Sequence, residues 1–198
     1  KLHIVHFDTN DVAVSERLSI ETAARNLRYD YYQKLYEQYG YNKIATAHHL
    51  NDQAETFFVN LLRTTGINGI CGIPLCRPLS YSNSNCKIIR PLMFASRKDI
   101  VEYTKDLSFV FDSTNSSDDY LRNRIRHHVI PELEAIRNNF PETLQKSMTQ
   151  FGYTRDFATR VIKDFFQQEQ STGGTIIPVP RNYSETELCG SLYFALYE

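Results

Sequence analysis

The sequence lacks the features that mark a membrane span or a cysteine-based metal site. No apolar run approaches the roughly 20 residues that a transmembrane helix needs, and no signal-peptide pattern opens the chain. None of the four cysteines belongs to a CxxC pair, so we expect reduced structural thiols rather than a zinc or redox site. They are Cys71, Cys76, Cys86 and Cys189. These absences favour a cytoplasmic protein.

An excess of charge of one sign is also missing. The chain has 22 Lys and Arg residues against 23 Asp and Glu residues, a net charge of -1. A protein that grips nucleic acid electrostatically usually carries a basic excess, so any contact with nucleic acid here must be local. The 198 residues, 41% of them hydrophobic and 23% charged, are typical of a globular protein and fit either one full domain or one domain plus part of a second.

Apolar spacing predicts alternating strands and helices in the first part of the chain. The expected elements are a strand over Leu2–Phe7, a helix between Ser19 and Gly40, a strand over Lys43–Ala47 and a helix from Asn51 to near Gly66, with Asn51 or Asp52 as its cap. This order indicates parallel strands joined by right-handed crossovers. We therefore predict the α/β class, with a doubly wound, mostly parallel, Rossmann-like sheet.

The later part of the chain turns helical. "KIIRPLM" predicts a further strand, and Ser96 with Asp99 predicts a capping box that opens a helix through Leu107. From about residue 138 the pattern is amphipathic and helical, before a "TIIPV" strand near the carboxyl end. We place a domain boundary near residue 138, with a catalytic part over residues 1–137 and a mainly helical part over residues 138–198.

Two adjacent histidines, in "ATAHHLNDQAET", lie between a predicted strand and a predicted helix. In parallel α/β sheets ligands bind beyond the carboxyl ends of the strands, and a helix amino terminus attracts phosphate. His48 and His49 could therefore contact phosphate oxygens, while Asp52 and Glu55 could hold Mg²⁺. The alternative is structural, with one histidine at the helix entry and the acids as favourable first-turn charges.

A second cluster, "LRNRIRHH" at residues 121–128, is basic and contains no acid. On a helix, Arg122 and Arg126 share a face beside Asn123, while Ile125 and Val129 turn inward. Such a face could clamp phosphates with bidentate hydrogen bonds. The alternative is a solvated face, or pairing with the upstream acids Asp118 and Asp119.

Together these segments resemble one family, the tRNA(Ile)-lysidine synthases of the N-type ATP pyrophosphatase superfamily. The matching motifs, over at least residues 19–134, are "AARNLRY", "ATAHHLNDQAET", "LLRTTGINGICGIP", "RPLMFASRKDI" and "DSTNSSDDYLRNRIRHHVIPEL". The resemblance implies an adenine nucleotide alpha hydrolase-like fold and a two-step reaction. ATP adenylates the C2 oxygen of the wobble cytidine in tRNA(Ile) with a CAU anticodon, and free L-lysine then displaces AMP to give lysidine.

The resemblance also implies roles for individual residues. The expected catalytic residues are His48, His49 and Asp52, with Asp52 as the Mg²⁺ ligand. ATP or AMP binding is expected of His48, His49, Arg122, Asn123 and Arg126, and tRNA or substrate binding of Arg28, Arg122, Arg124 and Arg126. The implied cofactors are ATP and Mg²⁺, residues 138–198 are expected to contact tRNA, and self-association into a homodimer is left open.

The chain departs from the family pattern in two places. Asn51 stands where the family usually has the first of two aspartates, so metal or acid chemistry falls to Asp52. The phosphate loop SGGxDS is absent from these residues, and "STGGT" resembles it only superficially. We therefore expect the chain to be a fragment of the catalytic protein that is inactive alone.

Two other functions fit parts of the pattern. One is a different ATP-dependent tRNA base modifier, such as a 2-thiocytidine or thiouridine synthetase, although those relatives commonly need paired cysteines. The other is a tRNA-binding module without catalysis, in which Asn51 and the missing loop mark a decayed site.

Overall fold

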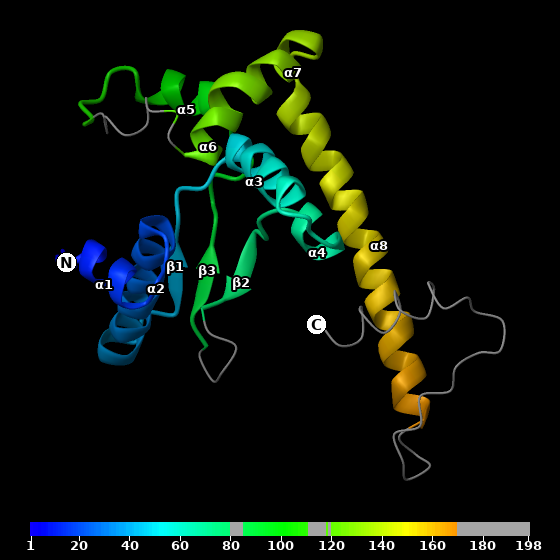
Figure 1. Cartoon of the computed structure of the whole chain (residues 1–198), viewed down its shortest axis with the longest axis horizontal. Coiled ribbons are helices and arrows are strands. Elements are labelled where there is room, and N and C mark those ends of the chain that lie inside the picture. Colours follow the sequence, from blue (N-terminus) through cyan, green and yellow to red (C-terminus); the bar gives the residue numbers. More distant parts are fainter. Residues whose placement is uncertain (80–84, 111–117, 119, 170–198) are drawn as a thin grey trace. The chain divides into compact units, whose positions relative to one another are not determined.

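The computed structural model describes residues 1–79, 85–110, 118 and 120–169, with side chains as far as residue 161. Within these residues the chain forms two compact units (Figure 1). The first consists of Lys1–Leu50 and Pro74–Leu107, and the second contains Asn51–Ile73 and the described residues from Ser108 onward. Each unit is therefore built from two segments that are distant in the sequence.

Helix α2, Ile20–Tyr39, has the ends that the sequence predicts. The Ser19 hydroxyl accepts a hydrogen bond from the backbone N–H of Thr22 at 3.2 Å, which satisfies a donor of the first turn. Gly40 ends the helix with φ 68°, a left-handed conformation that glycine adopts without steric cost. The prediction of a helix between Ser19 and Gly40 is confirmed.

The prediction of a strand over Leu2–Phe7 is wrong. This segment has no regular structure and leads into the short helix α1, Thr9–Ser15. A strand exists through hydrogen bonds to a neighbouring strand, and no described strand pairs with this segment. Its apolar side chains are consequently exposed, Leu2 to 82%.

Three short strands form the sheet of the first unit: β1, Lys43–Ala45, β2, Cys76–Pro78, and β3, Lys87–Ile89. Their order is β1-β3-β2, with β1 parallel to β3 and β2 antiparallel to it. The strands predicted in "KIATA" and "KIIRPLM" are confirmed in shorter form, whereas β2 was not predicted. Pro78, which lacks an N–H donor, fits β2 because β2 lies at the edge of this sheet.

The first unit has α/β architecture, since α2 packs on the sheet (Figure 1). The α/β class is thus confirmed, while the larger doubly wound sheet stays a prediction. The core between α2 and the strands combines aliphatic and tyrosine side chains: Leu79, Cys86 and Ile88 are buried, and Tyr29, Tyr32, Tyr36 and Ile44 pack against them. A parallel pair such as β1 and β3 needs a crossover connection, and the intervening chain contains α3.

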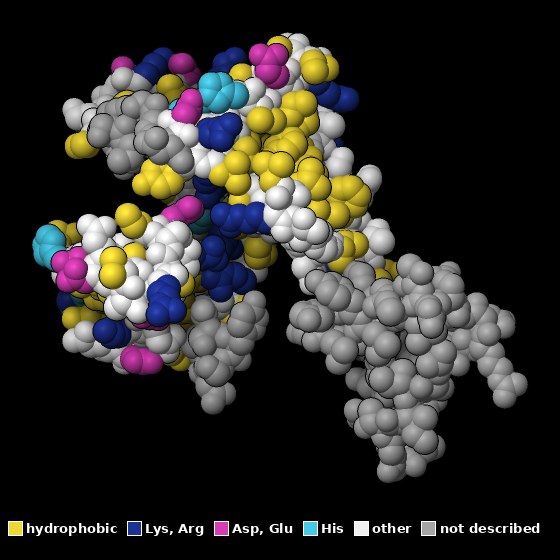
Figure 2. Space-filling model, viewed as in Figure 1, with side chains coloured by type: hydrophobic (Ala, Val, Ile, Leu, Met, Phe, Trp, Pro, Cys, Tyr) yellow, Lys and Arg dark blue, Asp and Glu magenta, His cyan; other side chains and the backbone are white. Residues whose placement is uncertain are grey.

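The second unit is helical in its described residues. Its elements are α3 (Leu50–Leu62), α4 (Ile67–Ile70), α6 (Leu121–Arg124), a π turn (Ile125–Val129), α7 (Ile130–Ile136) and α8 (Phe140–Glu169). The first residue of α3, Leu50, belongs to the first unit. Ala54 of α3 forms a buried cluster with Ile125 and Ile130, covered by Phe58, Val59 and Leu144. Figure 2 shows further apolar side chains at the surface over α3 and the first half of α8. The predicted cap of α3 is wrong, because Asn51 and Asp52 lie inside its first turn.

The π turn over Ile125–Val129 has a local cause in Pro131. In a regular α-helix the ring of Pro131 would collide with the carbonyl of His127, and that carbonyl would lose its donor. Here the N–H of Ile130 bonds to the carbonyl of Ile125, five residues back. Val129, the last residue of the π turn, is 37% exposed, so its predicted inward position is wrong.

The predicted helical pattern after residue 138 is confirmed by α8, which spans Phe140–Glu169. Through Leu144, α8 covers the buried cluster of α3, and it lies in the same compact unit. The predicted domain boundary near residue 138 and the tRNA-contacting role of residues 138–198 stay predictions. The predicted "TIIPV" strand lies outside the described residues. No helix in the described part of the chain is long and apolar enough to cross a bilayer.

Helix α5, Arg97–Thr104, completes the first unit and begins with the predicted capping box. The Ser96 hydroxyl accepts the N–H of Asp99 at 3.2 Å, and the Asp99 carboxylate accepts the N–H of Ser96 at 2.8 Å. The helix ends at Thr104, three residues before the predicted Leu107, and a turn bond from the N–H of Leu107 to the carbonyl of Thr104 follows it. Local sequence signals therefore account for the start of this helix.

Replacing Ser96 with alanine should lower the free energy of unfolding by about 1 kcal/mol, because the helix loses its N-cap acceptor. Hydrogen bonds from Ser96 lower the pKa of Asp99 below its ordinary 3.8. Their stabilisation is present above that ordinary value and is lost as the pH falls through the lower folded value. Urea unfolding at neutral pH and NMR titration of Asp99 would measure both effects. The backbone N–H at position 96 remains in Ser96→Ala, so the pKa of Asp99 should rise only part of the way to its ordinary value. A pKa of Asp99 unchanged by the substitution would contradict the hydrogen bond from the Ser96 hydroxyl.

Candidate active site

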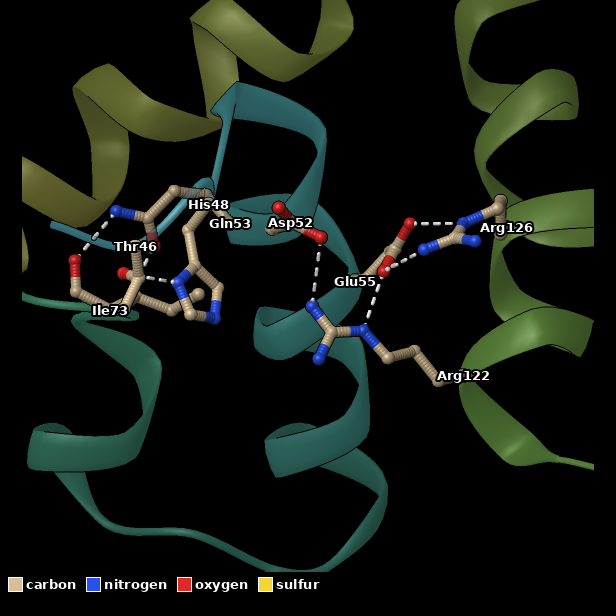
Figure 3. A network of polar contacts seen from close by, with 8 residues as sticks. All are labelled: Thr46, His48, Asp52, Gln53, Glu55, Ile73, Arg122 and Arg126. Atoms are coloured by element: carbon tan, nitrogen blue, oxygen red, sulfur yellow. Dashed lines mark hydrogen bonds and ion pairs between the residues drawn. The ribbon is translucent and has the colours of Figure 1, made fainter. Parts of the chain in front are cut away.

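The register of the sheet positions the first of the two histidines. β1 pairs with β3 so that Ala45 lies opposite Ile89, and the N–H of Thr46 continues this ladder to the carbonyl of Ile89 at 3.0 Å. The Thr46 hydroxyl and Nδ1 of His48 are then 2.8 Å apart and share a hydrogen bond. This bond orients the imidazole, and Nε2 lies on the opposite side of the ring (Figure 3). His48 and His49 are both partly buried at the end of β1, as predicted.

The second unit holds an ion-pair network centred on Glu55. This α3 side chain is only 1% exposed, yet it carries a carboxylate between two guanidinium groups. Arg122 donates from Nε to Oε2 at 2.6 Å, and Arg126 donates from Nε to Oε1 at 2.6 Å and from Nη2 to Oε2 at 3.0 Å. Figure 3 shows Glu55 pointing from α3 toward both arginines. A buried carboxylate is tolerated only with such partners.

The prediction that Arg122 and Arg126 share one helix face is confirmed by this common partner. Hydrogen bonds to Glu55 raise the pKa of Arg126, although burial acts to lower it. Among the described residues, Nη1 of each arginine donates no hydrogen bond. The network therefore fixes both guanidinium groups and leaves one donor end on each for a ligand such as phosphate.

Asp52 extends the same network by one turn of α3. Its Oδ1 accepts a hydrogen bond from Nη2 of Arg122 at 3.0 Å. Two carboxylates thus face two guanidinium groups, and their formal charges cancel. Phosphate would be attracted here by directed donors rather than by a net positive field.

Gln53, also in the histidine motif, ties α3 to the glycine-containing loop. Its buried side-chain amide donates to the carbonyl of Ile73 at 2.8 Å and accepts the N–H of the same residue at 2.7 Å. Gly72, the preceding residue, has φ 76°, and a Cβ there would lie 2.1 Å from Met148 and 2.3 Å from Gln53. Glycine is therefore required where the loop passes between α3 and α8.

Asp118 contacts the two histidines at the carboxyl end of the basic segment, residues 121–128. Its two oxygens contact Nδ1 of His127 at 2.7 Å and Nε2 of His128 at 2.6 Å. Hydrogen bonds from His128 and His127 lower the pKa of the Asp118 carboxyl. The alternative of pairing with Asp118 is thus realised by the histidines, whereas the arginines pair with α3. Asp119 lies outside the described residues.

The other predicted site residues have different surroundings. Arg124 is exposed on α6, Asn123 is buried in the same helix, and Arg28 is exposed on α2. The structure brings Asp52, Arg122 and Arg126 together in the second unit. His48, His49 and Arg28 belong to the first unit. The catalytic and binding roles of all these residues stay predictions.

Glu55 does not suit the magnesium role that the motif suggests for it, because both of its oxygens accept from arginine. Asp52 remains as one carboxylate beside Arg122. Magnesium commonly binds through one or two carboxylates together with substrate phosphates, so Asp52 fits a metal that arrives with ATP. The described residues contain no group of three or more potential protein ligands.

The model of the PP-loop domain matches residues 1–133. The chain belongs to the PP-loop family. This family has an adenine nucleotide alpha hydrolase-like α/β fold, in agreement with the fold class observed in the first unit.

Three relatives of this PP-loop chain carry the name tRNA(Ile)-lysidine synthase. The protein from Bacteroides thetaiotaomicron is 38% identical over 166 residues, covering 83% of this chain and 37% of the relative. The protein from Parabacteroides distasonis is 43% identical over 147 residues, covering 73% and 32%. The protein from Porphyromonas gingivalis strain W83 is 34% identical over 197 residues, covering 98% and 41%. The predicted resemblance is confirmed, and the chain spans between 32% and 41% of the length of these relatives.

The sequence interpretation of this PP-loop chain missed two positioning residues, Glu55 as an anchor for arginines and Gln53 as a clamp on the loop. The first had a visible signal, because Asp52 and Glu55 share a helix face by their spacing, as do Arg122 and Arg126. Opposite charges on two matching faces predict a pairing between the helices. The contact of Gln53 with the loop had no signal in the sequence, since an amide side chain does not indicate which backbone segment it will bind.

Glu55→Gln should lower the free energy of unfolding by about 3 kcal/mol, the lower end of the cost of breaking a buried ion pair. The lower end applies because both arginines are partly exposed and keep some contact with water. The matched control is Glu102→Gln, since Glu102 is 74% exposed and pairs with Lys105 three residues later, and an exposed salt bridge of this kind contributes little. Chemical unfolding of both variants measures the difference. Equal stability losses would show that Glu55 is not the anchor.

Proposed function

We propose that the protein containing this chain is a tRNA(Ile)-lysidine synthase. The observation that carries the proposal is the network that joins the histidine motif to the basic motif: Asp52 and Glu55 of one hold Arg122 and Arg126 of the other. These two motifs belong to the resemblance, and the three named relatives support the same activity. Their shared name supports lysine ligation over sulfur transfer.

The proposed reaction has two steps. In the first, the C2 oxygen of the wobble cytidine in tRNA(Ile) with a CAU anticodon attacks the α-phosphorus of ATP, and pyrophosphate leaves. In the second, the amino group of free L-lysine attacks C2, AMP leaves with the oxygen, and the amine loses its proton. A tRNA substrate would place the reaction in the cytoplasm.

The chain's own residues would act mainly through charge. Arg122 and Arg126 would donate from their remaining Nη1 groups to phosphate oxygens, with Asn123 beside them and Glu55 fixing both guanidinium groups. His48 and His49 would hydrogen-bond oxygens of the α-phosphate and the leaving pyrophosphate. Directed donors of this kind stabilise the charge that develops in the transition state. Mg²⁺ held by Asp52 would neutralise phosphate charge.

Several parts of the proposal concern tRNA binding and the wider protein. Arg28 and Arg124, both exposed, would contact the tRNA, together with residues 138–198. The larger doubly wound sheet and the SGGxDS phosphate loop would come from parts of the protein outside this chain. On this basis the chain alone would be inactive.

The direct test is mass spectrometry of tRNA(Ile) incubated with the intact protein, ATP, Mg²⁺ and lysine. The wobble cytidine should gain the mass of one lysine less one water. Reactions without lysine, and a tRNA with a different anticodon, serve as controls. An unmodified cytidine in the complete reaction would overturn the proposal.

In the intact protein, His49→Ala and Asp52→Asn should each reduce ATP–pyrophosphate exchange by about 10²-fold, because each removes a group from the phosphate site. Binding of tRNA should change little, since neither residue is assigned to the RNA. Isotope exchange and a tRNA-binding titration measure the two effects. Equal losses in both assays would contradict the assigned roles.

A further inference from the structure

The first unit contains a polar pocket that the proposed chemistry does not use. Its volume is about 260 Å³, and it lies between the carboxyl end of α1, the first half of α2 and strand β2. Its polar lining consists of Glu16, Arg25, Asn26, Tyr29, Asp30 and Arg77. All of these residues belong to one compact unit.

Positive charge gathers around the Tyr29 side chain at this pocket. The guanidinium carbon of Arg77 lies 4.9 Å from the ring centre and that of Arg25 lies 5.5 Å from it. Burial acts to raise the pKa of Tyr29, yet the hydrogen bond from Arg77 and the charges of Arg77, Arg25 and Arg90 lower it. Two guanidinium groups of the lining therefore converge on one phenol ring.

Within the described residues, no carboxylate forms an ion pair with Arg25 or Arg77. Arg77 donates from Nη1 to the carbonyl of Pro78 at 3.1 Å. Arg90, which is 6% exposed and does not line the pocket, donates to the carbonyl of Pro74. The two arginines of the lining therefore bring positive charge that no described ion pair uses.

The pocket also offers acceptors. Glu16 and Asp30 contribute carboxylates, and Asn26 contributes an amide. A phosphate alone would accept hydrogen bonds from the arginines and would leave the carboxylates and the amide without a donor. A nucleotide uses both, because its phosphate accepts from arginine while the amino and imino groups of its base donate. Guanidinium planes also stack on unpaired bases.

We propose that this pocket binds an unpaired nucleotide of the RNA substrate. Arg77 and Arg25 donate hydrogen bonds to its phosphate, and Asp30 and Asn26 accept hydrogen bonds from the edge of its base. The pocket thus anchors single-stranded RNA at a place separate from the residues assigned to ATP. This inference rests on the proposed function for the identity of the RNA, while the pocket itself is independent of that assignment.

The test uses the intact protein with a fluorescent anticodon stem–loop of tRNA(Ile), titrated at several salt concentrations. Arg77→Ala and Arg25→Ala should each weaken binding about tenfold, as expected for loss of a charged hydrogen bond. Each should also reduce the slope of log affinity against log salt by about 0.7, the contribution of one single-strand phosphate contact. The matched control is Lys34→Ala, which removes an exposed charge from the same helix outside the pocket. It should change neither quantity.

Two further measurements separate this inference from the proposed function. Thermal unfolding checks each variant, and Arg25→Ala serves if Arg77→Ala fails to fold, since Arg25 is exposed. Lysidine formation at saturating tRNA should persist in the pocket variants. Unchanged affinity and salt slope in a folded Arg25→Ala variant, with lysidine still formed, would overturn the pocket assignment alone. Loss of RNA affinity in a protein that makes no lysidine would overturn the function and retain the pocket.

Discussion

The second unit depends on one buried carboxylate. Glu55 lies on α3 with almost no exposure, and its charge is tolerated because Arg122 and Arg126 both donate to it. That requirement fixes α3 against the helix formed by α6 and the π turn. It also fixes the two guanidinium groups that are the best candidates to meet phosphate. The stability of the unit and the geometry of its site therefore rest on the same contacts.

The helix that carries these arginines shows how local chemistry reshapes a site. Pro131 cannot donate to the carbonyl one turn earlier, so the helix widens into a π turn. Arg126 lies in that turn and still reaches Glu55, while Asp118 holds His127 and His128 on the same turn. The arginines are thus oriented from α3, and the histidines from the segment that precedes α6.

Elements with strong local signals could be predicted from the sequence. The ends of α2 and the start of α5 follow from Ser19, Gly40 and the Ser96 capping box, whose hydrogen bonds span only a few residues. The strand over Leu2–Phe7 was wrong and β2 was missed, because a strand requires a partner that a local pattern does not contain. Of the site, the motif residues and the shared arginine face were predictable, but their common partner was not recognised.

The sequence by itself determined the α/β class, the main helices and the two motifs whose resemblance points to a PP-loop enzyme. The tertiary structure alone decided that Glu55 holds the arginines rather than a metal, that Gln53 clamps the loop at Ile73, and that Arg25 and Arg77 meet around Tyr29. The physical reason is the range of the forces involved. Caps and periodicity act within a few residues, whereas burial of a charge and convergence of cations depend on segments that only folding brings together.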